Sequence, residues 1–129
     1  MDLARELGAE EGFSTQKLCL YIPDRDKDGG EVRDYERWVN EGREILSRIG
    51  GGATALPPAD GTWEKANGDI LWEQTRLVYC FVDADRFEAN IKTLRAFLHR
   101  FGSETNQGEV VVEFDGQFYR VKTFDEPTG

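Results

Sequence analysis

The order of helical and strand patterns along the chain predicts an α+β fold, with an antiparallel sheet and two helices on one of its faces. Two segments, 35–49 and 84–101, repeat apolar residues every three or four positions, as amphipathic helices do. Several shorter segments alternate in polarity or are rich in β-branched and aromatic residues, which is typical of strands. Asn67-Gly68 and Asp115-Gly116 join neighbouring strand patterns as tight hairpin turns, and such turns connect antiparallel strands.

The first half of the chain predicts one strand followed by one helix. The strand covers 17–22 and stops at Pro23, which has no N–H to donate to a ladder. The helix has Tyr35, Trp38, Val39, Gly42, Ile45, Leu46 and Ile49 on one face. Asp34 is expected to cap its N-terminus, and Gly50-Gly51-Gly52 is expected to end it.

The second half predicts a group of strands, a long helix and a final hairpin. Short strands are expected at 54–56 and 62–64, with a bend at Pro57-Pro58, and a returning strand at 69–73 follows Asn67-Gly68. The most strand-like segment, 76–82, is expected at the centre of the sheet. Asp83 or Asp85 would cap the second helix, which Gly102 would close, and strands at 109–114 and 117–121 would complete the sheet.

The length of 129 residues fits one compact domain, which we expect to cover 17–124. Residues 1–16 are expected to form a flexible lead-in, because Gly8, Gly12 and Ser14 interrupt any helix there, and 125–129 are expected to form a frayed tail.

Composition argues against several classes of function. The chain has 25 acidic residues against 16 Lys plus Arg, and its net charge of -9 disfavours binding to nucleic acid or to an anionic membrane. The longest apolar run, 77–82, is too short to cross a bilayer, and the acidic start does not fit a secretory signal. These features predict a cytoplasmic protein with two reduced thiols, Cys19 and Cys80.

The element order is βαββαβ with an added hairpin and a final strand, and over 17–121 it resembles a ferredoxin-like domain. Three phrases, Gly50-Gly-Gly-Ala-Thr-Ala-Leu56, Gly61-Thr-Trp63 and the run 97–109, are similar to those of small uncharacterised prokaryotic proteins. The resemblance implies a fold and attaches no activity to it.

An acidic loop after the first strand suggests a calcium site. Asp24, Asp26, Asp28 and Gly29 match the opening of an EF-hand loop, where alternate carboxylates point at the ion. The later positions depart from that pattern, because Tyr35 takes the place of the bidentate Glu. A solvated turn explains the same residues. No cofactor is expected apart from calcium, whose stabilising effect an Asp26→Ala variant should lose.

Two further groups of polar residues are candidates for a site. His99 is the single histidine and lies on the flank of the second helix, where it is either an acid–base group or an amphipathic residue at the edge of the core. The polar run 103–107 would offer Glu104, Asn106 and Gln107 to a small polar ligand, or form a surface turn.

The strand patterns also predict that the sheet face away from the helices is apolar. Tyr21 and Tyr79 lie on strands whose two faces are both apolar, so this second face needs a cover. The cover would be either the hairpin that carries Trp63 and Trp72 or a second copy of the chain.

We therefore expect an acidic binding or interaction module that forms a homodimer through this face and takes another protein or a small polar ligand. One alternative is a small enzyme with a pocket between sheet and hairpin, near Tyr21 or Tyr79, using His99, Glu73 or Glu104 as acid–base group. The other is a calcium-responsive protein that binds the ion through Asp24, Asp26 and Asp28.

Overall fold

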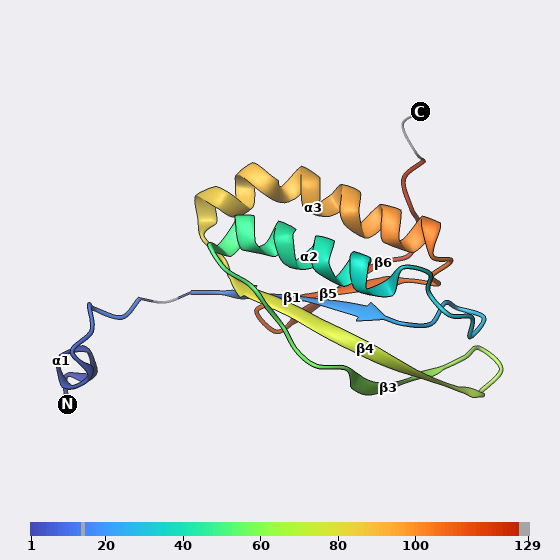
Figure 1. Cartoon of the computed structure of the whole chain (residues 1–129), viewed down its shortest axis with the longest axis horizontal. Helices are drawn as coiled ribbons and strands as arrows, with labels where there is room; N and C mark the ends of the chain where they lie inside the picture. Colours follow the sequence, from blue (N-terminus) through green and yellow to red (C-terminus); the bar gives the residue numbers. More distant parts are fainter. Residues whose placement is uncertain (14, 127–129) are drawn as a thin grey trace.

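The computed structural model describes residues 1–13 and 15–126, which form one antiparallel sheet with two long helices on one face (Figure 1). The strands are β1 (Lys17–Pro23), β2 (Thr54–Ala55), β3 (Ala59–Glu64), β4 (Ile70–Phe81), β5 (Val110–Phe114) and β6 (Gln117–Val121). The helices are α1 (Leu3–Leu7), α2 (Tyr35–Gly50) and α3 (Ala84–Glu104). The sheet order is β2-β4-β1-β5-β6, with β3 also paired to β4. The predicted α+β class and ferredoxin-like order, with extra strands, are confirmed.

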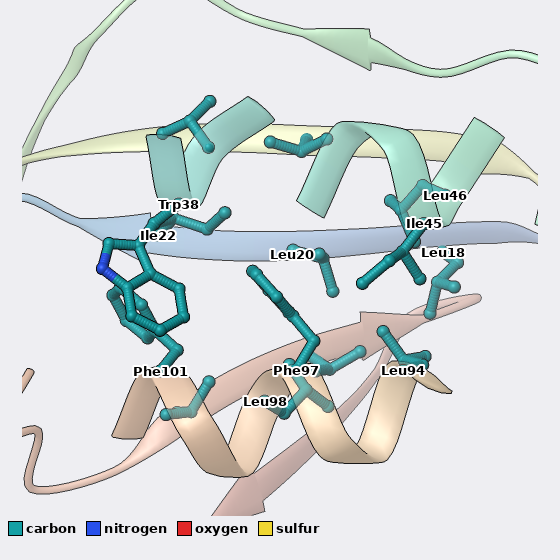
Figure 2. Close-up of a cluster of buried hydrophobic side chains, with 14 of the residues drawn as sticks. Leu18, Leu20, Ile22, Trp38, Ile45, Leu46, Leu94, Phe97, Leu98 and Phe101 are labelled. Atoms are coloured by element: carbon teal, nitrogen blue, oxygen red, sulfur yellow. The ribbon is translucent and has the colours of Figure 1, made fainter. Parts of the chain in front are cut away.

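The core lies between the sheet and the two long helices (Figure 2). Leu18, Leu20 and Ile22 of β1 are buried on this side, together with alternate residues of β4. Phe97 and Phe101 of α3 are each 1% exposed, and burial of a side chain of this size contributes about 1.5–3 kcal/mol. The period of two along the strands therefore assigns one face to the core, as the sequence predicts.

The two long helices begin differently. Asp83 caps α3, because its Oδ1 accepts the N–H of Arg86 at 3.0 Å. Asp34 precedes α2 but makes no side-chain capping bond, so this part of the prediction is wrong. Its backbone is left-handed, with φ 56°, whereas an N-cap residue uses an extended backbone to aim its side chain at the helix.

The end of α3 also departs from the prediction. The helix continues past Gly102 to Glu104, so Ser103 and Glu104 are helical rather than part of a loop. A Cβ on Gly102 would lie 2.1 Å from the ring of Phe124, which shows that this glycine allows close packing and does not end the helix. Asn106 adopts the left-handed conformation, with φ 57°, just after the helix.

β4 is a single 12-residue strand, although the sequence predicts two strands at 69–73 and 76–82. It is continuous because it has ladder partners along its whole length. β1 pairs with it from Thr75 to Phe81, and β3 pairs with it from Ile70 to Thr75. The predicted turn at Asn67-Gly68 joins β3 to β4, and Gly68 has a positive φ of 90°.

The chain ends differ in how they contact the domain. Helix α1 ends at Gly8 and buries none of its residues, and Figure 1 shows it away from the sheet. Ser14 and residues 127–129 lie outside the described residues. Phe124 packs against the core. Over the described ranges, no helix combines the length and apolar character that crossing a bilayer requires.

Candidate functional site

The sheet face opposite the helices, called the open face here, contains a large cavity. The pairing register places alternate residues of β1, β3 and β4 on this face, including Tyr21, Trp63 and Glu73. The cavity has a volume of about 790 Å³ and is called the open-face pocket. Its apolar walls are formed by Tyr21, Trp63, Leu71, Leu77, Val111 and Phe118, and its rim by residues 25–28, 64–66 and 107–109.

Glu73 is one of the carboxylates that line this pocket. It is half-buried on β4 and lies opposite Gly61 of β3, which has no side chain to cover it. The pKa of Glu73 is raised from 4.5 to about 7, mainly by burial and also by the charge of Asp24, while a hydrogen bond from Trp63 acts in the opposite direction. A carboxyl with this pKa exchanges protons near neutral pH.

Tyr21 forms one aromatic wall and has a fixed orientation. Its hydroxyl donates to Oε1 of Glu113 at 2.7 Å, and its ring centroid lies 6.0 Å from that of Phe118. Burial and the hydrogen bond to Glu113 raise the pKa of Tyr21, so the phenol stays protonated. Tyr21 is therefore a rigid flat surface in the pocket rather than a base.

One end of the pocket is formed by two loops that are hydrogen-bonded to each other. The Asn106 carbonyl accepts the N–H of Lys27 at 3.0 Å, and the Asn106 amide donates to Oδ2 of Asp28 at 3.0 Å. The buried side chain of Gln107 donates to the Arg25 carbonyl at 3.2 Å. These contacts explain why the polar run after α3 is rich in hydrogen-bonding groups.

The three aspartates of the predicted calcium loop are directed to different partners. Asp24 Oδ1 accepts the N–H of Gln74, Asp26 Oδ1 accepts the N–H groups of Asp28 and Gly30, and Asp28 accepts from Asn106. The hydrogen bond from Gly30 is the main cause that lowers the pKa of Asp26. Within residues 1–13 and 15–126, no group of three or more metal-binding side chains is assembled. Calcium binding remains a prediction from the sequence pattern.

The structure brings some of the predicted site residues together and separates others. Tyr21, Glu73, Gln107, Asp26 and Asp28 all line the open-face pocket. Tyr79 lies on the open face outside this pocket, with the Lys17 ammonium 4.4 Å from its ring centroid. Asn106 does not line the pocket, but it is hydrogen-bonded to the rim residues Lys27 and Asp28.

His99 and Glu104 lie elsewhere, in a second cavity beside α3. Neither residue lines the open-face pocket. They were named together with Glu73 only because all three can act as acid–base groups. Phe118 was not among the predicted site residues. Its position in a strand of alternating pattern could have indicated that it lies on the open face.

Comparisons with known proteins support the fold. No family model and no curated protein matches the chain. Among solved structures, a phage SAM lyase in complex with S-methyl-5'-thioadenosine superposes with a TM-score of 0.61 at 13% identity, covering 88% of this chain and 94% of the other. A phage SAM lyase in the apo state gives 0.58 at 14% identity, covering 92% and 98%. At these identities the likeness shows a shared fold.

Proposed function

We propose that this protein binds a small molecule in the open-face pocket and that Glu73 is the ionisable group that acts on it. One observation carries this proposal, which is a half-buried carboxyl with a pKa of about 7 facing a cavity of about 790 Å³. Such a group is divided between its protonated and ionised forms at neutral pH, so it can accept or donate a proton.

The lining of the pocket supports a flat, positively charged ligand. Tyr21, Trp63 and Phe118 present aromatic surfaces on which a planar ring stacks. The acidic residues of the lining, Asp26, Asp28, Asp60, Glu64, Glu73 and Glu109, outnumber Arg25, Lys27 and Lys65. A nucleoside-like cation fits both properties. SAM and S-methyl-5'-thioadenosine, named with the structural neighbours, are the first compounds to test.

Isothermal titration calorimetry with these two compounds tests the proposal. We expect binding to the wild type, weaker binding to Trp63→Ala, and loss of any preference for the cation in Glu73→Gln. Glu44→Gln, an exposed change on α2, is the control with the same change in charge. Incubation with SAM followed by chromatography for S-methyl-5'-thioadenosine tests catalysis. Absence of binding to both compounds at millimolar concentration would refute the nucleoside-like ligand.

A second candidate function is self-association through exposed aromatic residues of the open face, both at the pocket and beside it. Phe81 and Phe118 are 54% and 63% exposed on this face, and Tyr79 lies 6.0 Å from Phe81 between ring centroids. A second copy of the chain would remove these rings from water. Light scattering after size exclusion should show a dimer that Phe81→Glu dissociates. Phe13→Glu, at an exposed phenylalanine of the N-terminal segment, should not, and a monomeric wild type at high concentration contradicts the candidate.

A further inference from the structure

The second cavity has a row of hydrogen-bond donors along one face of α3. It has a volume of about 600 Å³ and lies between this helix and residues 125–126. Lys92, Arg95, His99 and Ser103 line it at intervals of three and four, so they lie on the same side of the helix. Ala96 lies between them and leaves space above the helix.

His99 is held in one tautomer in this cavity. Its side chain is buried, with 9% of the residue exposed, and its Nδ1 accepts the backbone N–H of Asp125 at 2.7 Å. An Nδ1 that accepts a hydrogen bond carries no proton, so the neutral ring has its proton on Nε2. His99 lines the cavity, and among the described residues its hydrogen bond is made through Nδ1, which leaves the Nε2–H as the donor that it can offer to a ligand.

The carboxylate of Asp125 already occupies part of this donor row. Arg95 binds it with two parallel hydrogen bonds, from Nε to Oδ2 at 2.8 Å and from Nη2 to Oδ1 at 2.9 Å. The same Oδ2 lies 3.4 Å from Nδ1 of His99. Planar two-point binding by arginine is the usual way in which proteins recognise carboxylates and phosphates.

The segment that carries Asp125 is held by a separate contact. Phe124 packs beside Gly102, and its ring lies edge-on to the ring of His99, with 6.2 Å between the two ring centroids. The ion pair between Asp125 and Arg95 is more exposed than this packing contact, with 53% of the Asp125 side chain accessible. A competing anion can therefore replace the Asp125 carboxylate without removing Phe124 from its position.

We propose that this face of α3 is a binding site for a small molecule that carries an oxyanion, either a carboxylate or a phosphate, and that Asp125 occupies the site from within the chain. Lys92, Arg95 and the Nε2–H of His99 supply the donors. Arg100 also lines the cavity but is paired with Glu41. Glu104 and Glu126 also line the cavity, and their negative charges limit how much negative charge a ligand can carry. The site is independent of the open-face pocket.

The single histidine makes the test direct, because its imidazole signals in an NMR spectrum need no assignment. Wild-type protein is titrated with inorganic phosphate, with acetate, and with sodium chloride of matched ionic strength, at constant pH. We expect the signals of His99 to shift saturably with an oxyanion and not with chloride. A response to phosphate alone or to acetate alone supports the site and identifies the group.

Three variants test the role of each part. Asp125→Asn keeps the backbone bond to His99 but removes the internal anion, so half-saturation should occur at about fivefold lower concentration, as expected for loss of an exposed ion pair. Arg95→Gln should abolish the saturable shift. Arg37→Gln, an exposed change on α2, should behave as wild type.

Three results would overturn the proposal. Equal shifts with chloride and with both oxyanions would show a response to ionic strength only. A titration of Arg95→Gln that matches the wild type would show that Arg95 does not bind the oxyanion. Unchanged affinity in Asp125→Asn would show that the Asp125 carboxylate does not compete for the site.

Discussion

Replacing Glu73 by Gln should stabilise the protein at alkaline pH and have little effect at acid pH. The pKa of Glu73 is about 7 in the folded protein and 4.5 in its usual state, so the folded protein holds this proton more tightly. Stability is therefore lost as the pH rises from 4.5 through 7, and does not change further on this account above 7. The glutamine side chain keeps the shape of the protonated acid and removes this dependence.

The magnitude follows from the same two pKa values. The difference between 4.5 and about 7, at about 1.36 kcal/mol for each pH unit, corresponds to about 3 kcal/mol. Solvent screening at a half-buried group reduces the expected gain to about 1–2 kcal/mol at pH 8. Urea unfolding of the wild type and of Glu73→Gln at pH 5 and pH 8 measures this gain. The difference in unfolding free energy between the two proteins should be larger at pH 8 than at pH 5. Glu64→Gln, at an exposed carboxylate of the same hairpin, is the matched control. An equal gap at both pH values would refute the reasoning.

Three further predictions concern the pocket and the packing. Trp63→Ala should weaken binding of a nucleoside-like ligand by about 1–3 kcal/mol in calorimetry, the usual contribution of one stacked ring, with unchanged binding as the contrary result. Gly50→Ala should destabilise the fold by about 1–3 kcal/mol in urea, because its Cβ would lie 2.6 Å from a backbone oxygen of β4, whereas Gly52→Ala has open space and should be tolerated. Asn106→Ala and Asn106→Gly both lose the bond to Asp28, but only alanine is strained at the positive φ, so Asn106→Ala should cost about 1–2 kcal/mol more, and equal effects would contradict this.

The parts of the fold that the sequence predicted were those governed by local periodicity. The period of two identified Leu18, Leu20 and Ile22 as one set, and the structure buries all three against the helices. The period of three to four located both long helices. Asp34 and Gly102 were misassigned because a cap or a helix end depends on backbone conformation and on distant packing. The contact between Gly102 and Phe124 joins residues that the local pattern around Gly102 does not connect.

The candidate site was predicted in part, for the same reason. Chemistry alone nominated Glu73 and Tyr21, and the structure places both in one pocket. The polar run with Asn106 and Gln107 and the acidic loop before α2 were treated as two separate sites. The structure shows that they hydrogen-bond to each other, a pairing between distant segments that no local pattern reveals.

The position of Glu73 is itself an argument for function. The chain has a net charge of -9, and Glu73 adds a half-buried carboxylate close to the charge of Asp24, which makes its ionised form unfavourable. Among the described residues, no ion pair joins Glu73 to a Lys or Arg that would compensate for this cost. A glutamine would fill the same space without the penalty, so the structure gives no stabilising reason for the acid at this place. Ionisable groups in unfavourable surroundings are concentrated at functional sites, and Glu73 lines a cavity of about 790 Å³.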